Sequence, residues 1–279
     1  MVVVEVQDPN TKKIYDYFIE PKLKKQIDKK VIPTLKQKDE DYVFIIDGDE
    51  RSGKSTFGMQ LGKYIDNSLD LDRVCFTPDE FRKAIINAKK YQVVIFDEAY
   101  RGLAAKGALT EVNKLLVSLM MEMGQKNLCV IVILPTFYLL EKYVAIWRAR
   151  GLFHVFRSNK GQKGYFVFFN KKKKKQLYLK GKKDYSYKYV KSYFKGRFYG
   201  KYVVDEKKYR EKKAESLKQG YKTTRQEKYK EQRDKLIYIL HKEYDISSIK
   251  MEELLKTYRL AIKSRTIRDI VRKKEGHPQ

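Results

Sequence analysis

Short, uninterrupted apolar runs recur through the first half of the chain, each followed by a polar or glycine-rich stretch. These runs are Tyr42–Ile46, Val93–Phe96 and Leu128–Leu134. They are typical of strands that are buried on both faces, as in a parallel sheet covered by helices. Apolar residues recur at helical spacing over Thr56–Ile65 and Thr110–Gly124. This alternation predicts an α/β fold with a mainly parallel central sheet.

Further elements can be placed from local signals. Val74–Phe76 forms a short strand candidate, and Thr77 followed by Pro78 and two acidic residues is the pattern of a helix start. After residue 151 the apolar positions are spaced as in short strands, which predicts β-hairpins added to the sheet. The run Lys171–Lys175 is expected to be a loop that joins such strands.

The chain becomes helical and highly charged from Asp205 onward. Opposite charges at i,i+4 spacing over 205–225 predict an exposed, charged linker helix. Three further helices are expected to enclose a small apolar core, at Gln226–Tyr244, Ser248–Tyr258 and Ser264–Lys274, with Ser264 as the cap of the last. The expected domains are residues 1–204 (core 40–157, basic β-rich extension 158–204), the linker 205–225 and a helical domain at 226–279.

A complete G-x-x-x-x-G-K-S pattern lies between the first apolar run and the helix after it. In such a loop the backbone N–H groups and the helix N-terminus point at one anion. The lysine reaches the β- and γ-phosphates, and the last hydroxyl lies on Mg²⁺. The alternative is a chance glycine-rich turn, but the flanking strand and helix favour ATP with Mg²⁺. The expected nucleotide-binding residues are Gly48, Asp49, Glu50, Arg51, Ser52, Gly53, Lys54, Ser55 and Thr56.

Two carboxylates, Asp97 and Glu98, end the second apolar run. At the end of a strand beside the loop, Asp97 can hold Mg²⁺ together with Ser55, and Glu98 can orient and deprotonate the attacking water. A second acidic residue at this point indicates hydrolysis rather than kinase-type transfer. The third apolar run ends at Thr136, which is either a sensor of the γ-phosphate or part of a plain strand-to-loop turn.

Charge is distributed unevenly along the 279 residues. Residues 1–150 carry 24 Lys and Arg against 21 Asp and Glu, which leaves 38 against 14 in the remainder. Such asymmetry indicates a polyanionic partner, with nucleic acid as the first candidate and an anionic membrane surface as the second. The alternative is a general lysine bias, but a bias alone makes both halves basic. No apolar run is long enough to span a bilayer, so we expect a cytoplasmic protein without integral membrane association.

The order GDERSGKS, VVIFDEAY, MEMGQKN, CVIVILPTF and IWRAR resembles the FtsK/HerA superfamily of DNA-pumping ATPases. This superfamily includes viral genome-packaging ATPases and the related Zot-type proteins. The resemblance covers about residues 40–157 and implies a RecA-like (ASCE) P-loop NTPase fold. Two positions differ from the usual pattern, because the family commonly has Arg in place of Gln125 and Gln where this chain has Pro135-Thr136.

The resemblance also implies a homo-oligomeric ring, a pentamer or a hexamer, in which an arginine of one subunit reaches the neighbour's γ-phosphate. Such a finger neutralises charge in the transition state. Arg148 and Arg150 follow the proposed sensor strand and are the first candidates. The alternative is that they are ordinary surface or DNA-facing arginines. Arg51, inside the glycine-rich loop, is a further candidate and would act on its own subunit's nucleotide.

The basic back half offers two sets of candidate DNA contacts. The first is the lysine run, in a region where further lysines are interleaved with tyrosines over 185–199. Lysines with aromatic residues suit phosphate contact and base stacking, although the lysines could instead be solvated loop residues. The last helix is similar to the recognition helix of helix-turn-helix proteins, with a generic three-helix interaction module as the alternative. The candidate DNA-binding residues are Lys171, Lys172, Lys173, Lys174, Lys175, Arg265, Thr266, Arg268 and Arg272.

The resemblance, together with the charge distribution, implies a DNA-stimulated ATPase that translocates double-stranded DNA, as a packaging or transfer motor of a virus or mobile element. Its location is then the host cytoplasm, and a portal or capsid protein is a further expected partner. One alternative is a DNA-binding regulator or partition protein that uses ATP as a switch. Another is a Zot-type phage assembly ATPase.

Overall fold

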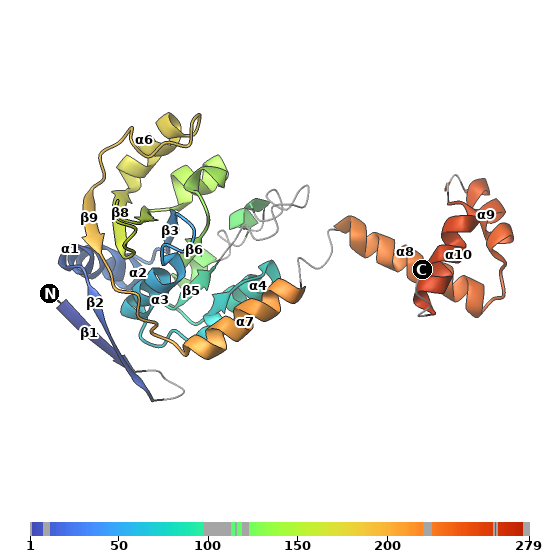
Figure 1. The fold of residues 1–279 in the computed structure, drawn as a ribbon, viewed down its shortest axis with the longest axis horizontal. Helices are drawn as coiled ribbons and strands as arrows, with labels where there is room; N and C mark the ends of the chain where they lie inside the picture. Colours follow the sequence, from blue (N-terminus) through green and yellow to red (C-terminus); the bar gives the residue numbers. More distant parts are fainter. Residues whose placement is uncertain are drawn as a thin grey trace. The chain divides into compact units, whose positions relative to one another are not determined.

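The computed structural model describes residues 2–7, 12–97, 113–114, 116–118, 123–219, 225–258, 260 and 262–275. The chain divides into two compact units, Met1–Gly220 and Tyr221–Gln279, and Figure 1 shows the fold of each. The boundary between them lies near the end of the stretch 205–225 that the charge pattern predicts as a linker.

A seven-stranded sheet forms the centre of the first unit. Five neighbouring strands run parallel, and two antiparallel strands extend the sheet at one edge. The predicted α/β class, the mainly parallel sheet and the added antiparallel strands are confirmed. In spatial order the strands are β4 (Val74–Cys75), β5 (Val93–Phe96), β6 (Cys129–Ile133), β3 (Tyr42–Gly48), β7 (Gly151–Phe156), β8 (Tyr165–Asn170) and β9 (Phe194–Arg197).

The three apolar runs of the sequence lie side by side as β5, β6 and β3. Cys129 of β6 pairs with Tyr42 of β3 on one side and with Val93 of β5 on the other, so the strands start level. Because they are parallel, their carboxyl ends also meet at one edge of the sheet. The loop after β3 and Asp97 after β5 therefore lie at the same edge.

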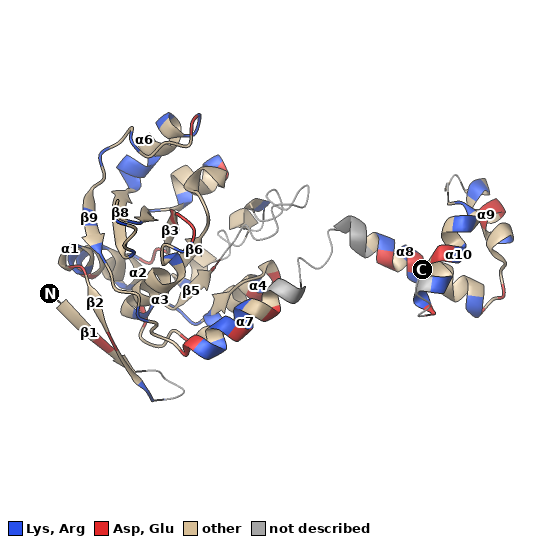
Figure 2. Ribbon diagram, viewed as in Figure 1, with Lys and Arg blue, Asp and Glu red and all other residues tan. Residues whose placement is uncertain are grey.

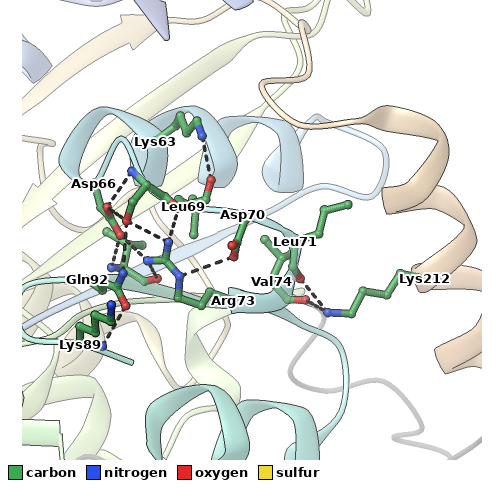
Figure 3. Close-up of polar contacts among 12 residues, drawn as sticks. Lys63, Asp66, Leu69, Asp70, Leu71, Arg73, Val74, Lys89, Gln92 and Lys212 are labelled. Atoms are coloured by element: carbon green, nitrogen blue, oxygen red, sulfur yellow. Dashed lines mark hydrogen bonds and ion pairs between the residues drawn. The ribbon is translucent and has the colours of Figure 1, made fainter. Parts of the chain in front are cut away.

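Helix α3 (Lys54–Ile65) packs closely on one face of the sheet, and two glycines allow the approach. A Cβ added to Gly58 would lie 2.7 Å from Ile133 Cδ1, and one added to Gly62 would lie 3.2 Å from Ile95 Cδ1. The 3₁₀ turn Leu71–Arg73 follows this helix. There Arg73 pairs with Asp66, and the buried Lys63 donates to Leu69 O at 2.8 Å (Figure 3). These contacts fix the carboxyl end of α3 against the sheet.

The opposite face of the sheet is covered by α4 (Pro78–Asn87) and by the elements that follow β6. Thr77 caps α4 as predicted, and its side chain accepts a hydrogen bond from Glu80 N. Phe81 of α4 stacks on Phe96 of β5 at 4.6 Å. The 3₁₀ turn Phe137–Leu139, the π-helix Tyr143–Arg148 and α6 (Lys171–Gly181) cover the region near β7 and β8.

The N-terminal segment adds elements that the sequence patterns do not predict. β1 (Val2–Gln7) and β2 (Ile14–Ile19) form a separate antiparallel hairpin, which Tyr17 joins to α3 by donating to Gln60 O at 3.0 Å. A continuous helical stretch follows, whose apolar side enters the same core cluster as α3. It consists of α1 (Pro21–Gln26), the π-helix Ile27–Val31 and α2 (Ile32–Gln37).

The lysine run Lys171–Lys175 is not a loop, and this prediction is wrong. Asn170 caps α6 by accepting a hydrogen bond from Lys173 N at 3.1 Å, and the lysines form the first turns of the helix. Lys174 is completely buried and donates to Ala145 O and Ile146 O, so it caps the π-helix and cannot contact DNA. Burial lowers the pKa of its ammonium group to about 7. The other four lysines are at least partly exposed, and Figure 2 marks the basic positions of α6 in blue.

Helix α7 (Glu206–Gln219) also differs from the expected exposed linker. It belongs to the first unit, because Tyr209 is buried in the core cluster that contains α3. Lys212 Nζ fixes its middle by donating to Leu71 O at 2.7 Å and Val74 O at 2.8 Å (Figure 3). The alternating charges do predict the solvent-exposed side of α7, but they do not indicate that its other side is buried.

The C-terminal unit contains the three expected helices, α8 (Arg225–Lys242), α9 (Ser248–Thr257) and α10 (Ser264–Lys274). Their apolar core consists of Ile237, Met251, Ile267 and Ile270. Ser264 is not the cap of α10, because Lys263 holds that position. Ser264 N instead donates to Glu252 Oε2 at 2.7 Å, which joins the start of α10 to α9.

The predicted helix Thr110–Gly124 lies partly outside the described residues. Residues 113–114 and 116–118 within it are helical, and the 3₁₀ turn Met123–Lys126 lies at its end. Cys75 and Cys129 are buried free thiols. None of the helices in the described part of the chain has both the length and the apolar character that crossing a membrane requires.

Candidate nucleotide-binding site

The glycine loop (Gly48–Ser55) has a backbone that its glycines make possible. Gly48 has a φ of +130°, and a Cβ there would lie 1.8 Å from Val155 O. Gly53 has a φ of +100° and directly precedes α3. Arg51 also adopts a positive φ, 56°, which few non-glycine residues do. The loop therefore closes tightly over the carboxyl end of β3.

The start of α3 faces the space enclosed by this loop. The first backbone N–H groups of a helix have no partner within it and carry partial positive charge, so they attract anions. Lys54 lies on the same rim, where its Nζ donates to Gly48 O and Asp49 O at 2.7 Å each. The lysine charge is thus held at the mouth of the loop.

Asp97 is the buried acid of the site. Its Oδ1 accepts a hydrogen bond from Ser55 Oγ at 3.1 Å, and its Oδ2 accepts one from Tyr209 Oη at 2.6 Å. A hydroxyl and a carboxylate are hard oxygen ligands of the kind that Mg²⁺ prefers. Ser55 and Asp97 therefore fit the Mg²⁺ role that the sequence predicts for them.

A pocket of about 920 Å³ opens in front of the loop. Its wall contains residues 50–56 of the loop and α3, Asp97, residues 133–135 after β6, and the segment 198–202. Five basic side chains line it against two carboxylates, so it favours an anionic ligand. The basic residues are Arg51, Lys54, Lys163, Arg210 and Lys213.

Two sequence-predicted catalytic residues are not part of this pocket as described. Glu98 lies outside the described residues. Thr136 does not line the pocket, and its hydroxyl lies 3.1 Å from Tyr187 Oη. Tyr187 in turn donates to the buried Asp47, which also accepts from Phe137 N at 2.7 Å. These contacts favour the strand-to-loop turn over the γ-phosphate sensor for Thr136.

Arg148 and Arg150 lie at the other end of the sheet from the glycine loop. Arg148 pairs with Asp41, and Arg150 pairs with Glu40 at 2.7 Å. Both carboxylates directly precede β3, whereas the loop follows it. Seven strand residues, at about 3.3 Å each, separate the two ends. Neither arginine can therefore reach the pocket of its own subunit.

Several pocket residues have no counterpart among the sequence predictions. Tyr209, Arg210 and Lys213 come from α7, and Lys163 comes from the connection between β7 and β8. Gln60 of α3 holds the segment 198–202 over the helix by donating to Tyr199 O and Lys201 O at 2.7 Å. The tyrosine-rich composition of this region is visible in the sequence, but no spacing relates it to the glycine loop.

The proposed recognition helix presents its basic side to solvent. Ile267 and Ile270 are buried against the rest of the C-terminal unit. The four candidate DNA contacts of α10 are all exposed, namely Arg265, Thr266, Arg268 and Arg272. Their exposure is what DNA contact requires, although a protein-binding helix could present the same side chains.

The chain matches no protein-family model and no curated protein sequence.

Gly48→Ala is expected to disrupt the loop, because the new Cβ would overlap Val155 O. Overlap and positive-φ strain together predict destabilisation by several kcal/mol, with loss of nucleotide binding. Thermal unfolding and titration with a fluorescent ATP analogue measure the two effects. Gly124→Ala is the control, since nothing lies within 4 Å of a Cβ at that position. Equal melting temperatures for the two variants would contradict the steric argument.

Proposed function

We propose that this protein is an ATP-hydrolysing P-loop enzyme of the RecA-like type. The observation that carries the proposal is the 3.1 Å contact between Ser55 Oγ and Asp97 Oδ1. It joins the end of the glycine loop to the end of β5, across the intervening strand β6. A chance glycine-rich turn gives no reason for a hydroxyl and a buried carboxylate to meet beside a cationic pocket. The order of the strands in the sheet is also compatible with a RecA-like fold.

In this proposal the loop and α3 bind the triphosphate. Backbone N–H groups at the start of α3 donate to phosphate oxygens, and Lys54 exchanges its two carbonyl contacts for the β- and γ-phosphates. The pocket is large enough for a nucleotide, and its wall includes Tyr199 and Tyr202 as aromatic surfaces. Binding therefore uses charge and backbone geometry more than base-specific contacts.

Hydrolysis would use the acids at the end of β5. Ser55 and Asp97 would hold Mg²⁺, which supplies charge neutralisation for the β- and γ-phosphates. Glu98 directly follows Asp97 in sequence, and we assign it the role of orienting and deprotonating the attacking water. Ser55 and Tyr209 both donate to Asp97, and these two hydrogen bonds hold its carboxylate in place.

We further propose that ATP turnover drives movement along double-stranded DNA, as in the FtsK/HerA superfamily that the motifs resemble. The support comes from charge, since the residues after 150 carry 38 basic against 14 acidic side chains. The exposed basic side of α10 adds a second DNA-contact surface to the basic extension. A ring of subunits and a role in genome packaging or transfer belong to this proposal through the resemblance alone.

The identity of the arginine that assists hydrolysis is part of the proposal. Arg51 lines the pocket, whereas Arg148 and Arg150 have carboxylate partners at the opposite end of the sheet. We therefore favour Arg51 as the arginine that acts on the nucleotide of its own subunit. Arg148 or Arg150 could act only on a neighbouring subunit.

The ATPase assignment predicts separate effects of two substitutions. Lys54→Ala should abolish binding of ATP, because it removes the charge that meets the β- and γ-phosphates. Glu98→Gln should bind ATP but lose about 10²-fold or more in kcat, because the water loses its base. Nucleotide titration and phosphate release, with and without double-stranded DNA, test both. Lys83→Ala, an exposed lysine of α4, is the control for charge loss.

Turnover of ATP by Glu98→Gln at the wild-type rate would overturn the assignment of the catalytic base. ATP binding without DNA-stimulated hydrolysis would instead favour a DNA-binding regulator that uses ATP as a switch.

Arg51→Ala is expected to leave ATP affinity within a few-fold and to lower kcat by about 10³. Arg150→Ala should hydrolyse ATP normally, because its side chain pairs with Glu40 away from the pocket. Both rates are measured at saturating ATP. A normal rate for Arg51→Ala together with a low rate for Arg150→Ala would identify Arg150 as an arginine supplied to a neighbour. Mixing that variant with Glu98→Gln subunits should then restore activity.

Combined substitution of Arg265, Arg268 and Arg272 by Ala is expected to weaken binding of double-stranded DNA. Each lost phosphate contact should flatten the dependence of log K on log salt by about 0.9. The control in the full chain replaces Lys29, Lys30 and Lys83, three exposed lysines of the first unit. Equal effects of the two triple variants would remove α10 from DNA binding and favour docking to a protein such as a portal or capsid subunit.

A further inference from the structure

Helix α7 contributes three side chains to the nucleotide pocket, although the glycine loop and the acids after β5 lie more than a hundred residues earlier. Tyr209, Arg210 and Lys213 all line the pocket together with residues 50–56 and Asp97. Tyr209 and Lys213 are four residues apart and therefore lie on one side of the helix. Arg210 is adjacent to this side.

The position of α7 is fixed at several points. Val203 and Val204, just before the helix, are buried, and the Tyr209 ring packs 5.5 Å from the ring of Phe76. Lys212 donates to two carbonyls beside β4, as Figure 3 shows. Tyr209 thus lies at the carboxyl ends of β4 and β5, where the pocket opens, while Lys212 fixes the next turn of α7 at the start of β4.

The Tyr209 hydroxyl is a hydrogen-bond partner of the Asp97 carboxylate. The hydroxyl donates to Oδ2 at 2.6 Å, while Ser55 occupies Oδ1. With Oδ2 held, the carboxylate plane is fixed and Oδ1 is directed at Ser55.

Arg210 and Lys213 are basic side chains on the same wall. Arg210 donates to Glu206 at 2.6 and 2.8 Å, and its side chain is about two-thirds exposed. Lys213 Nζ lies 5.9 Å from the centre of the Tyr209 ring. A triphosphate carries more negative charge than the single carboxylate of Glu206, so it can draw the guanidinium into the pocket.

We propose that α7 forms a functional part of the nucleotide-binding site. Tyr209 positions Asp97 for metal binding, and Arg210 and Lys213 contact the nucleotide polyphosphate. This inference rests on the proposed ATP-binding function. All three residues lie outside the glycine loop and the acids after β5. Arg210 and Lys213 would contact the nucleotide bound by their own subunit. Tyr209 acts through Asp97 and is therefore a positioning residue.

The polyphosphate contacts are tested in the full chain by Arg210→Ala combined with Lys213→Ala. The matched control combines Lys207→Ala with Lys208→Ala, which removes the same charge from exposed positions of the same helix outside the pocket. Affinities for fluorescent ATP and ADP analogues are measured with Mg²⁺. We expect ATP binding to weaken about tenfold or more in the first variant, with a smaller loss for ADP. The control should stay within about twofold of the wild-type chain.

Equal weakening of ATP binding in both double variants would overturn the contacts of Arg210 and Lys213, because only long-range charge would then act. Loss of ATP binding in Lys54→Ala with an unaltered affinity in Arg210→Ala, Lys213→Ala would leave the proposed function intact and overturn this inference alone. Failure of the wild-type chain to bind ATP would overturn both.

The positioning role is tested by Tyr209→Phe, which keeps the buried ring and removes the hydroxyl. ATP affinity is compared in Mg²⁺ and in EDTA, with a thermal unfolding curve as the folding control. We expect affinity in Mg²⁺ to fall about fivefold or more, while affinity in EDTA stays unchanged. A merely structural role would lower both affinities equally. An equal loss of ATP affinity in Mg²⁺ and in EDTA would overturn the role of Tyr209. An ATP affinity in Mg²⁺ that is unchanged or higher than that of the wild-type chain would overturn it as well.

Discussion

The candidate site depends on one buried carboxylate, Asp97. A charged group in the protein interior costs several kcal/mol unless hydrogen bonds compensate it. Here Ser55 at the start of α3 and Tyr209 in the middle of α7 both donate to Asp97. The carboxylate therefore requires that β5, α3 and α7 keep fixed relative positions. This constraint explains why the highly charged helix at 206–219 is packed against the other elements of the first unit.

Much of the fold could be predicted because its signals are local. Strands β3, β5 and β6 are buried on both faces, so each appears as an uninterrupted apolar run. Thr77 with Pro78 starts α4 as the sequence indicates, and the three helices of the C-terminal unit follow from periodicity. The glycine loop and Asp97 were recognisable for the same reason, since motif and flanking elements are adjacent in the chain. A parallel sheet then brings the motif residues to one edge.

The wrong predictions arose where distant contacts decide the structure. Lys171–Lys175 has the composition of a solvated loop, but Asn170 can cap a helix, and Lys174, Leu177 and Tyr178 share one side of it. That spacing was the available signal, and five consecutive lysines obscured it. Tyr209 had no comparable signal, because nothing in 205–225 shows that one tyrosine among many charges meets Asp97. The mixed charges describe only the solvent-facing side of α7.

Arg148 and Arg150 pair with carboxylates that differ in burial, and this difference distinguishes the two arginines. Asp41 is nearly buried, so removing Arg148 from it would leave an unpaired buried carboxylate, at a cost of about 3–5 kcal/mol. A charge-assisted contact to a neighbouring nucleotide returns about 1.5–3 kcal/mol. Arg150 pairs with an exposed Glu40, and such pairs contribute only about 0–1 kcal/mol. Of the two arginines, Arg150 can therefore leave Glu40 and contact the nucleotide of another subunit, whereas Arg148 is required as the ion-pair partner of Asp41.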